Sequence, residues 1–235
     1  MIAAMKPTLI LVPGLLCDAL VWKHQLAAFG ATHALLVPEL SNATSLGAMA
    51  QQVLDAAPAR FAIAGHSLGG RIALEVARRA PERLTHLGLL DTGVGPVGPA
   101  EEAARMELVR LAETAGLAAV AKAWLPPMLH PQRRTDPAFV APLAAMIAGR
   151  AVAGFRRQQE ALLSRPDARP VLAMLRCPTL VLTGREDEWS PPAQHEAIAA
   201  AVPGSTLVIV PAAGHFAPLE QPAAVNAAMR DWLAR

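Results

Sequence analysis

The sequence contains no tyrosine, and only four tryptophans and five phenylalanines stand among its 235 residues. A ligand pocket is therefore expected to have few aromatic side chains. An excess of one charge is missing as well, because 21 Lys and Arg residues face 19 Asp and Glu residues. Nucleic-acid-binding domains usually carry a concentrated basic excess. The charge balance therefore argues against a nucleic-acid partner.

Long apolar runs are also missing. A membrane span needs about 20 consecutive apolar residues, and the apolar stretch 8–16 is interrupted by Pro13 and Gly14. A signal peptide is not expected, because Lys6 is the only charged residue near the start. Cys17 and Cys177 are far apart and show no metal-ligand spacing. These absences favour a cytoplasmic protein with two reduced thiols, no membrane partner and no bound metal.

The sequence is rich in apolar residues, which make up 53% of the chain and include 50 alanines. A chain this apolar can bury a sizeable core, and its length fits one domain or one domain with a lid. Six apolar segments, each too short for a helix and apolar on both faces, resemble buried parallel strands. Strands are predicted at residues 8–12, 33–37, 60–64, 85–91, 179–183 and 205–210, and helices at residues 18–29, 46–56, 68–79, 191–201 and 222–234.

This rotation of strand, loop and helix predicts an α/β fold, a doubly wound, mostly parallel six-stranded sheet that binds ligands at its carboxyl edge. Residues 94–169 show no strand pattern, but helices at 101–124, with a break near Gly116, and at 137–164, behind an Asp136 N-cap. We predict a core of residues 1–93 and 170–235, with residues 94–169 inserted between the fourth and fifth strands as a helical cap. Crossover helices without a lid role are the alternative.

The third predicted strand leads into residues 65–70 (GHSLGG), which match the pattern G-x-S-x-G between a strand and a helix. In this turn the serine lies on a strained backbone. Side chains two positions away on either side would collide with the neighbouring strand and helix, so Gly65 and Gly69 must be small. Ser67 is thereby predicted at a helix N-terminus, where the dipole stabilises developing negative charge. We expect Ser67 to be a nucleophile.

A serine hydroxyl is a poor nucleophile without a base. Of the seven histidines, His215 is the strongest candidate, because it follows the sixth predicted strand and so lies at the carboxyl edge. His66 adjoins Ser67, but its side chain is expected to point away along the turn. The base also needs an orienting carboxylate, and Asp187, after the fifth strand, is preferred over Asp91, after the fourth. The order serine, acid, histidine is the one that this architecture uses.

These segments resemble the α/β-hydrolase superfamily, in the small capped branch of carboxylesterases, enol-lactonases and C–C bond hydrolases. The resemblance implies that the backbone N–H groups of Leu15 and Leu68 form an oxyanion hole. Pro13-Gly14 stands where relatives usually have His-Gly, and only seven residues precede the first strand, so the usual N-terminal hairpin is expected to be absent. The resemblance covers nearly the whole chain outside the cap and rests on residues 12–14 with Trp22, 65–70, 184–191 and 214–222.

The expected function is that of a serine hydrolase of the carboxylesterase type, which cleaves a small or medium ester or lactone through an acyl-enzyme without a cofactor. An enol-lactonase, C–C bond hydrolase or perhydrolase at the same triad is the alternative, and a non-catalytic ligand-binding module is a remote one. An inward-turned cap arginine among positions 133, 134, 150, 156 and 157 could hold a substrate carboxylate; otherwise these are solvated helix faces. The pocket candidates are Leu16, Trp22, Trp124, Met128, Phe155, Trp189 and Phe216.

Overall fold

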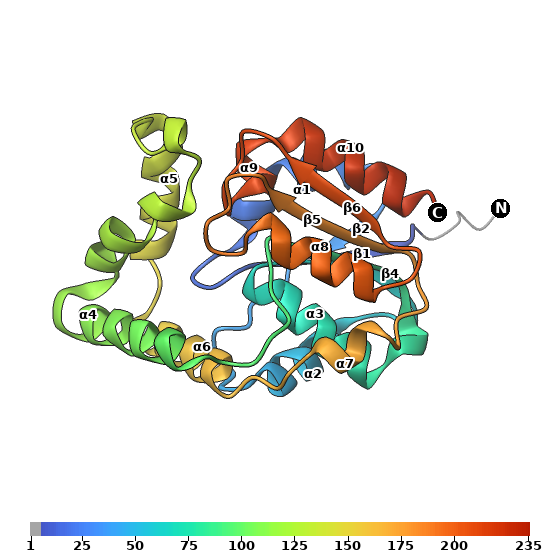
Figure 1. The fold of residues 1–235 in the computed structure, drawn as a ribbon, viewed down its shortest axis with the longest axis horizontal. Coiled ribbons are helices and arrows are strands. Elements are labelled where there is room, and N and C mark those ends of the chain that lie inside the picture. Colours follow the sequence, from blue (N-terminus) through green and yellow to red (C-terminus); the bar gives the residue numbers. More distant parts are fainter. Residues whose placement is uncertain (1–5) are drawn as a thin grey trace.

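The computed structural model describes residues 6–235 of the chain (Figure 1). Its sheet has six strands, all parallel, in the order β2-β1-β3-β4-β5-β6. The prediction of a doubly wound parallel sheet is confirmed. The predicted absence of a hairpin concerns residues 1–7, of which residues 1–5 lie outside the described part. The strands are β1 (Thr8–Val12), β2 (Ala34–Leu36), β3 (Phe61–His66), β4 (Leu84–Leu90), β5 (Thr179–Gly184) and β6 (Thr206–Val210).

Helices cover both faces of the sheet, which is why its central strands are apolar on both sides. One face carries α1 and α10, and the other carries α2, α3 and α8 (Figure 1). The predicted helix 18–29 divides into two parts, because Asp18 caps a separate 3-10 turn before α1 begins. The bounds are η1 (Ala19–Trp22), α1 (Lys23–Phe29), α2 (Leu46–Ala56), α3 (Leu68–Arg79), η2 (Pro81–Arg83), α8 (Pro192–Ala201), α9 (Ala217–Glu220) and α10 (Pro222–Leu233).

The segment between β4 and β5 is helical, as predicted. Gly116 kinks the first helix with a φ of 79°, in the left-handed region that glycine adopts readily. Asp136 caps the next helix by accepting the N–H groups of Ala138 and Phe139. The short helix α7 was not predicted. The elements are α4 (Pro99–Trp124), η3 (Pro126–Met128), η4 (Pro131–Arg133), α5 (Pro137–Ala148), α6 (Val152–Leu163) and α7 (Arg169–Leu172).

The second predicted helix of this segment is broken between α5 and α6, which meet at 91°. The break follows Gly149, whereas Gly154 lies inside α6. No single helix within residues 6–235 has the length and hydropathy of a membrane span. The bent pair of α5 and α6 has that length and hydropathy only when both helices are counted together.

The inserted helices lie beside the core, at the edge where the strands end (Figure 1). Several hydrogen bonds join them to loops of the core, and two of these involve loops that follow β1 and β6. The Met128 carbonyl accepts the His215 N–H at 2.7 Å, and Gln158 Oε1 accepts the Leu16 N–H at 3.1 Å. Because Leu16 follows β1 and His215 follows β6, these bonds place the insertion over the carboxyl edge of the sheet.

Candidate active site

The turn between β3 and α3 holds Ser67 in a strained conformation, with φ 55° and ψ −115°. A Cβ atom on Gly65 would lie 2.1 Å from the Gly69 carbonyl oxygen. A Cβ atom on Gly69 would lie 2.1 Å from the Val12 carbonyl oxygen in β1. Both positions therefore accept only glycine, for the reason predicted from the sequence, and the tight turn lifts Ser67 to the edge of the sheet.

His215 is hydrogen-bonded to both Ser67 and Asp187. Its Nε2 is 2.8 Å from Ser67 Oγ, and its Nδ1 is 2.8 Å from Asp187 Oδ2. A carboxylate only accepts, so the shared proton belongs on Nδ1, which leaves Nε2 to accept from the Ser67 hydroxyl. His215 and Asp187 are buried, while Ser67 is partly exposed. The arrangement can remove a proton from Ser67 and stabilise the resulting imidazolium.

The Asp187 carboxylate is held in its ionised form. Burial alone would raise its pKa, but the charge and hydrogen bond of His215 lower the pKa below the ordinary value. The backbone N–H groups of Trp189 and Ser190 add to this effect, because both donate to Oδ1 at 2.8 Å. These two bonds also fix the carboxylate, so that Oδ2 faces the imidazole.

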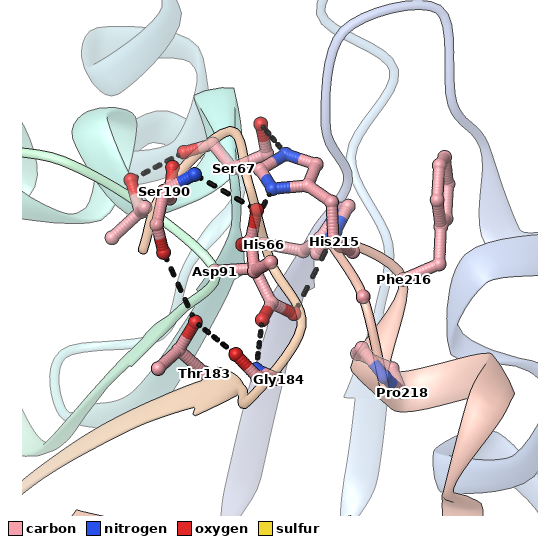
Figure 2. A network of polar contacts seen from close by, with 12 residues as sticks. His66, Ser67, Asp91, Thr183, Gly184, Ser190, His215, Phe216 and Pro218 are labelled. Carbon is pink, nitrogen blue, oxygen red and sulfur yellow. Dashed lines mark hydrogen bonds and ion pairs between the residues drawn. The ribbon is translucent and has the colours of Figure 1, made fainter. Parts of the chain in front are cut away.

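Asp91, the rival acid, lies at the end of β4 without a hydrogen bond to His215. Its Oδ1 accepts the Gly184 N–H at 3.0 Å, and its Oδ2 is 3.9 Å from His66 Nε2 (Figure 2). These contacts hold the Asp91 side chain against the end of β5 and beside His66. Burial, followed by the charge of Asp187, raises the pKa of Asp91 well above its ordinary value. A neutral carboxyl cannot stabilise an imidazolium as a charge does, so the geometry favours Asp187 as the orienting acid.

His66 takes part in the site through its ring, which was not predicted. Instead of pointing away along the turn, His66 Nε2 lies 2.7 Å from the His215 carbonyl oxygen. Burial, followed by the charge of His215, lowers the pKa of His66 to about 3. The ring is therefore neutral and donates its Nε2 proton to that carbonyl. With the Met128 carbonyl on the His215 N–H, this bond fixes the backbone of the base from both sides.

Glu220 is a second residue whose role the sequence did not reveal. Its Oε1 accepts the Gly214 N–H at 3.0 Å, and its Oε2 accepts the His130 N–H of the insertion at 2.8 Å. The carboxylate thus links the His215 loop to the inserted segment. Glu220 stands within residues 214–222, which carry the family resemblance, but only the folded chain shows which N–H groups surround it.

The Leu15 N–H, the first predicted oxyanion donor, is oriented by its neighbours. The Gly14 carbonyl, in the same peptide unit, accepts the Cys17 N–H at 3.1 Å. Because N–H and C=O point in opposite directions across a trans peptide, this bond fixes the Leu15 N–H. The following residue, Leu16, has a strained φ of 60°, and its N–H is bound by Gln158 from α6. The insertion thus supports the loop that carries this donor.

The second predicted donor, the Leu68 N–H, is oriented in the same way. The Ser67 carbonyl of its peptide unit accepts from Thr92 Oγ1 at 2.6 Å and from the Gly70 N–H at 3.0 Å. Leu68 begins α3, so its N–H has no partner within that helix. Leu15 and Leu68 both line the cavity that contains Ser67. The geometry is therefore compatible with the predicted oxyanion hole.

Gln158→Leu should lower kcat for a chromogenic ester about tenfold, because the loop that carries the Leu15 N–H loses one of its orienting hydrogen bonds. KM should change little, because Gln158 does not line the cavity that contains Ser67. Steady-state kinetics, with thermal unfolding as a check on the fold, measure this effect. Gln132→Leu, an exposed change in η4, is the matched control. Equal kcat in Gln158→Leu and the wild type would refute this role of Gln158.

A cavity of about 290 Å³ opens beside Ser67. Of the seven predicted pocket residues, Trp124 and Trp189 line it, in a T-shaped pair with ring centroids 6.3 Å apart. Leu16 and Phe155 line a separate hollow, together with Gln158. The remaining three, Trp22, Met128 and Phe216, are buried in the core and do not line this cavity.

Packing around His66 explains two of these outcomes. The ring centroids of Trp22 and Phe216 lie 6.4 Å and 5.4 Å from the ring centroid of His66. His215 lies between Phe216 and Ser67 (Figure 2). Their large apolar rings are buried around that histidine and are not available to a ligand.

The charged residues of the cavity were not predicted. Arg71 of α3 and the pair Glu101 and Arg105 of α4 line it. Arg71 lies in the first turn of α3, the helix that follows Ser67, and this closeness to Ser67 was a signal available in the sequence. The arginines at positions 133, 134, 150, 156 and 157 bind acidic side chains or backbone oxygens elsewhere and do not line the cavity.

Glu101→Gln should reveal how strongly this charge cluster supports the fold. Burial opposes ionisation of Glu101, but hydrogen bonds from Arg165 and Arg105 lower its pKa from 4.5 to about 2. The carboxylate therefore stabilises the fold fully above about pH 4.5, and this contribution is lost as pH falls toward 2. The Arg165 side chain is only 2% exposed, so loss of its partner is costly, but solvent weakens the interaction because Glu101 is one-third exposed. The free energy of unfolding of the variant should therefore be about 2–3 kcal/mol lower at pH 7.

Urea unfolding of both proteins at pH 7, 4 and 3 measures this difference. The difference in free energy of unfolding between wild type and Glu101→Gln should become smaller as pH falls. A difference that stays constant across this pH range would contradict the proposed ionisation of Glu101.

Among residues 6–235, no group of three or more His, Cys, Asp or Glu residues is arranged to hold a metal ion.

Known proteins share this sequence pattern and fold. A family model described as the alpha/beta hydrolase family matches residues 9–228. A Klebsiella pneumoniae (strain 342) protein, provisionally named carbamate hydrolase RutD, is 28% identical, with 97% of this chain and 91% of that protein covered. An esterase from Thermogutta terrifontis, solved with malate bound, has a TM-score of 0.89 and 28% identity over 98% of this chain and 90% of its own. An enol-lactonase from Burkholderia xenovorans LB400 shares the fold with a TM-score of 0.88 at 24% identity, over 100% and 94% of the two chains.

Proposed function

We propose that this chain, which belongs to the alpha/beta hydrolase family, is a serine hydrolase that cleaves a small or medium carboxylic ester or lactone. The observation that carries this proposal is the continuous hydrogen-bonded series Ser67, His215 and Asp187, whose serine lines a cavity. The esterase among its relatives, at 28% identity, supports the choice of ester.

The reaction follows from the positions of these groups. His215 Nε2 accepts the Ser67 proton while Oγ attacks the ester carbonyl, and the N–H groups of Leu15 and Leu68 stabilise the oxyanion. Collapse of the tetrahedral intermediate breaks the ester C–O bond, and the His215 Nε2 proton passes to the leaving alcohol. Water, deprotonated by His215 Nε2, then attacks the acyl carbonyl; the bond between that carbon and Ser67 Oγ breaks, and the proton passes from His215 to Oγ as the acid leaves. Asp187 keeps the imidazole oriented throughout.

Residues 94–169 act in this proposal as a cap on a core of residues 1–93 and 170–235. Trp124 and Leu108 of α4 line the same cavity as Ser67. Met128 and Gln158 bond to the two core loops that carry the base and the first oxyanion donor. The cap therefore both encloses the substrate and supports the residues that act on it.

Hydrolysis of 4-nitrophenyl acetate, butyrate and octanoate tests the proposed activity. We expect multiple turnovers, fastest for the shorter esters because the cavity measures only about 290 Å³. Absence of turnover on every ester of the series would overturn the assignment as an esterase.

Carbamate hydrolysis is a second candidate, favoured by the name of the 28% identical Klebsiella relative. The same attack by Ser67 would apply to a carbamate carbonyl, so the residues alone do not separate the two. A comparison of kcat/KM for 4-nitrophenyl butyrate and 4-nitrophenyl N-methylcarbamate does. A higher value for the carbamate would replace the ester proposal.

A further inference from the structure

Arg71 extends into the cavity of Ser67 without an acidic partner. Within residues 6–235, no carboxylate oxygen lies within 4 Å of its guanidinium, and its one side-chain hydrogen bond is from Nη1 to the Gly95 carbonyl at 3.0 Å. The side chain is only partly exposed. A guanidinium carries five N–H donors, so most of the donors of Arg71 remain available to a ligand.

The nearby carboxylate is already occupied. Glu101 accepts from Arg165 Nη1 at 2.8 Å and from Arg105 Nε at 2.8 Å, and Arg105 also donates to Gln159 Oε1 at 2.9 Å. Two guanidinium groups thus occupy the Glu101 carboxylate, and in the described part of the chain Arg71 is left without one. Burial, followed by the charge of Arg165, lowers the pKa of Arg71 to about 9. A partly buried cation without a counter-charge is unfavourable, and a bound anion would relieve this cost.

We infer that Arg71, with Arg105 beside it, binds a carboxylate on the substrate, so that the preferred substrates are monoesters of short dicarboxylic acids. Arginine is suited to this task because its planar fork matches a carboxylate in a bidentate manner. Ser67 and Arg71 line the same cavity of about 290 Å³. A carboxylate bound by Arg71 therefore lies only a few carbons from the carbonyl that Ser67 attacks. This inference rests on the proposed function.

Monoethyl glutarate and ethyl valerate provide the test, because they differ only in a carboxylate in place of a methyl group. A pH-stat at pH 7 follows proton release from both. We expect the wild type to prefer monoethyl glutarate in kcat/KM by at least about tenfold, the range of a charge-assisted hydrogen bond. In Arg71→Gln this ratio should fall close to 1, and in Arg71→Lys it should be intermediate, because the charge stays but the bidentate fork is lost.

Arg110→Gln is the matched control, since it removes the same charge from an exposed position on α4 outside the cavity. Its ratio should equal that of the wild type. A wild type without preference would overturn the inference. A ratio that survives in Arg71→Gln, with both esters slowed equally, would also overturn it and assign Arg71 to holding the Gly95 loop.

Failure of the hydrolase proposal itself gives a different result, in which neither ester is hydrolysed. The carboxylate site is then tested by calorimetric titration with glutarate. We expect binding to the wild type and at least about tenfold weaker binding to Arg71→Gln. No binding to the wild type, or equal binding to both, would overturn the inference in that case.

Discussion

Ser67→Ala is expected to lower kcat for 4-nitrophenyl butyrate by about 10⁴–10⁶. The change removes the one oxygen that lies 2.8 Å from His215 Nε2, and no covalent intermediate can form without it. Ser67 is partly exposed, and its side-chain hydrogen bond is to His215, so the fold should be retained. Steady-state assays give the loss of rate, and thermal unfolding checks that the variant is folded.

Ser190→Ala is the matched control for this prediction. Ser190 also lines the cavity, but its hydroxyl makes no hydrogen bond to the imidazole in the described structure. Its kcat should remain within about tenfold of the wild type. A folded Ser67→Ala variant that keeps a comparable rate would show that another group attacks the substrate.

Asp187→Asn should lower kcat by about 10⁴. The carboxamide keeps the size of the side chain, but it can donate a hydrogen bond to His215 Nδ1. The imidazole then carries its proton on Nε2, where it cannot accept the Ser67 proton. A pH–rate profile and kcat measurements on the purified variant follow this loss.

Asp91→Asn separates the two acids that the sequence offered. Asp91 is equally buried, but it bonds to the Gly184 N–H rather than to His215, so its loss should cost less than about tenfold in kcat. A larger loss in Asp91→Asn than in Asp187→Asn would exchange the roles of the two carboxyl groups.

The sheet, the turn at Ser67 and the order of the site residues could be predicted because each depends on local sequence. Six apolar segments indicate the strands. The turn at Ser67 is indicated by Gly65 and Gly69, where contacts with adjacent elements leave no room for a side chain. His215 and Asp187 could be placed because the carboxyl ends of parallel strands share one edge.

The residues that support the site depend on tertiary contacts far apart in sequence. Gln158 is 142 positions from Leu16, and Glu220 is 90 positions from His130. The sequence contains no periodicity or spacing that joins such pairs. The large apolar pocket candidates were over-counted for a related reason, because Trp22 and Phe216 are used to pack around His66.

Charge was the least predictable property of the cavity. The chain as a whole is nearly neutral. The basic residues of the insertion that the sequence offered as carboxylate-binding candidates do not line the cavity. The uncompensated charge instead lies on Arg71, in the first turn of α3 and outside the insertion. Net charge describes the solubility and long-range field of a protein, whereas substrate selection depends on which few charges face the cavity.

Labelling by a fluorophosphonate probe tests the central claim most directly, because the probe reacts only with a serine that a base has activated. Intact-protein and peptide mass spectrometry of the labelled wild type should show one phosphonyl group, located on Ser67. Ser67→Ala should remain unlabelled, and His215→Ala should be labelled far more slowly. An unlabelled wild type, or a label on another residue that persists in Ser67→Ala, would contradict the assignment of Ser67 as the nucleophile.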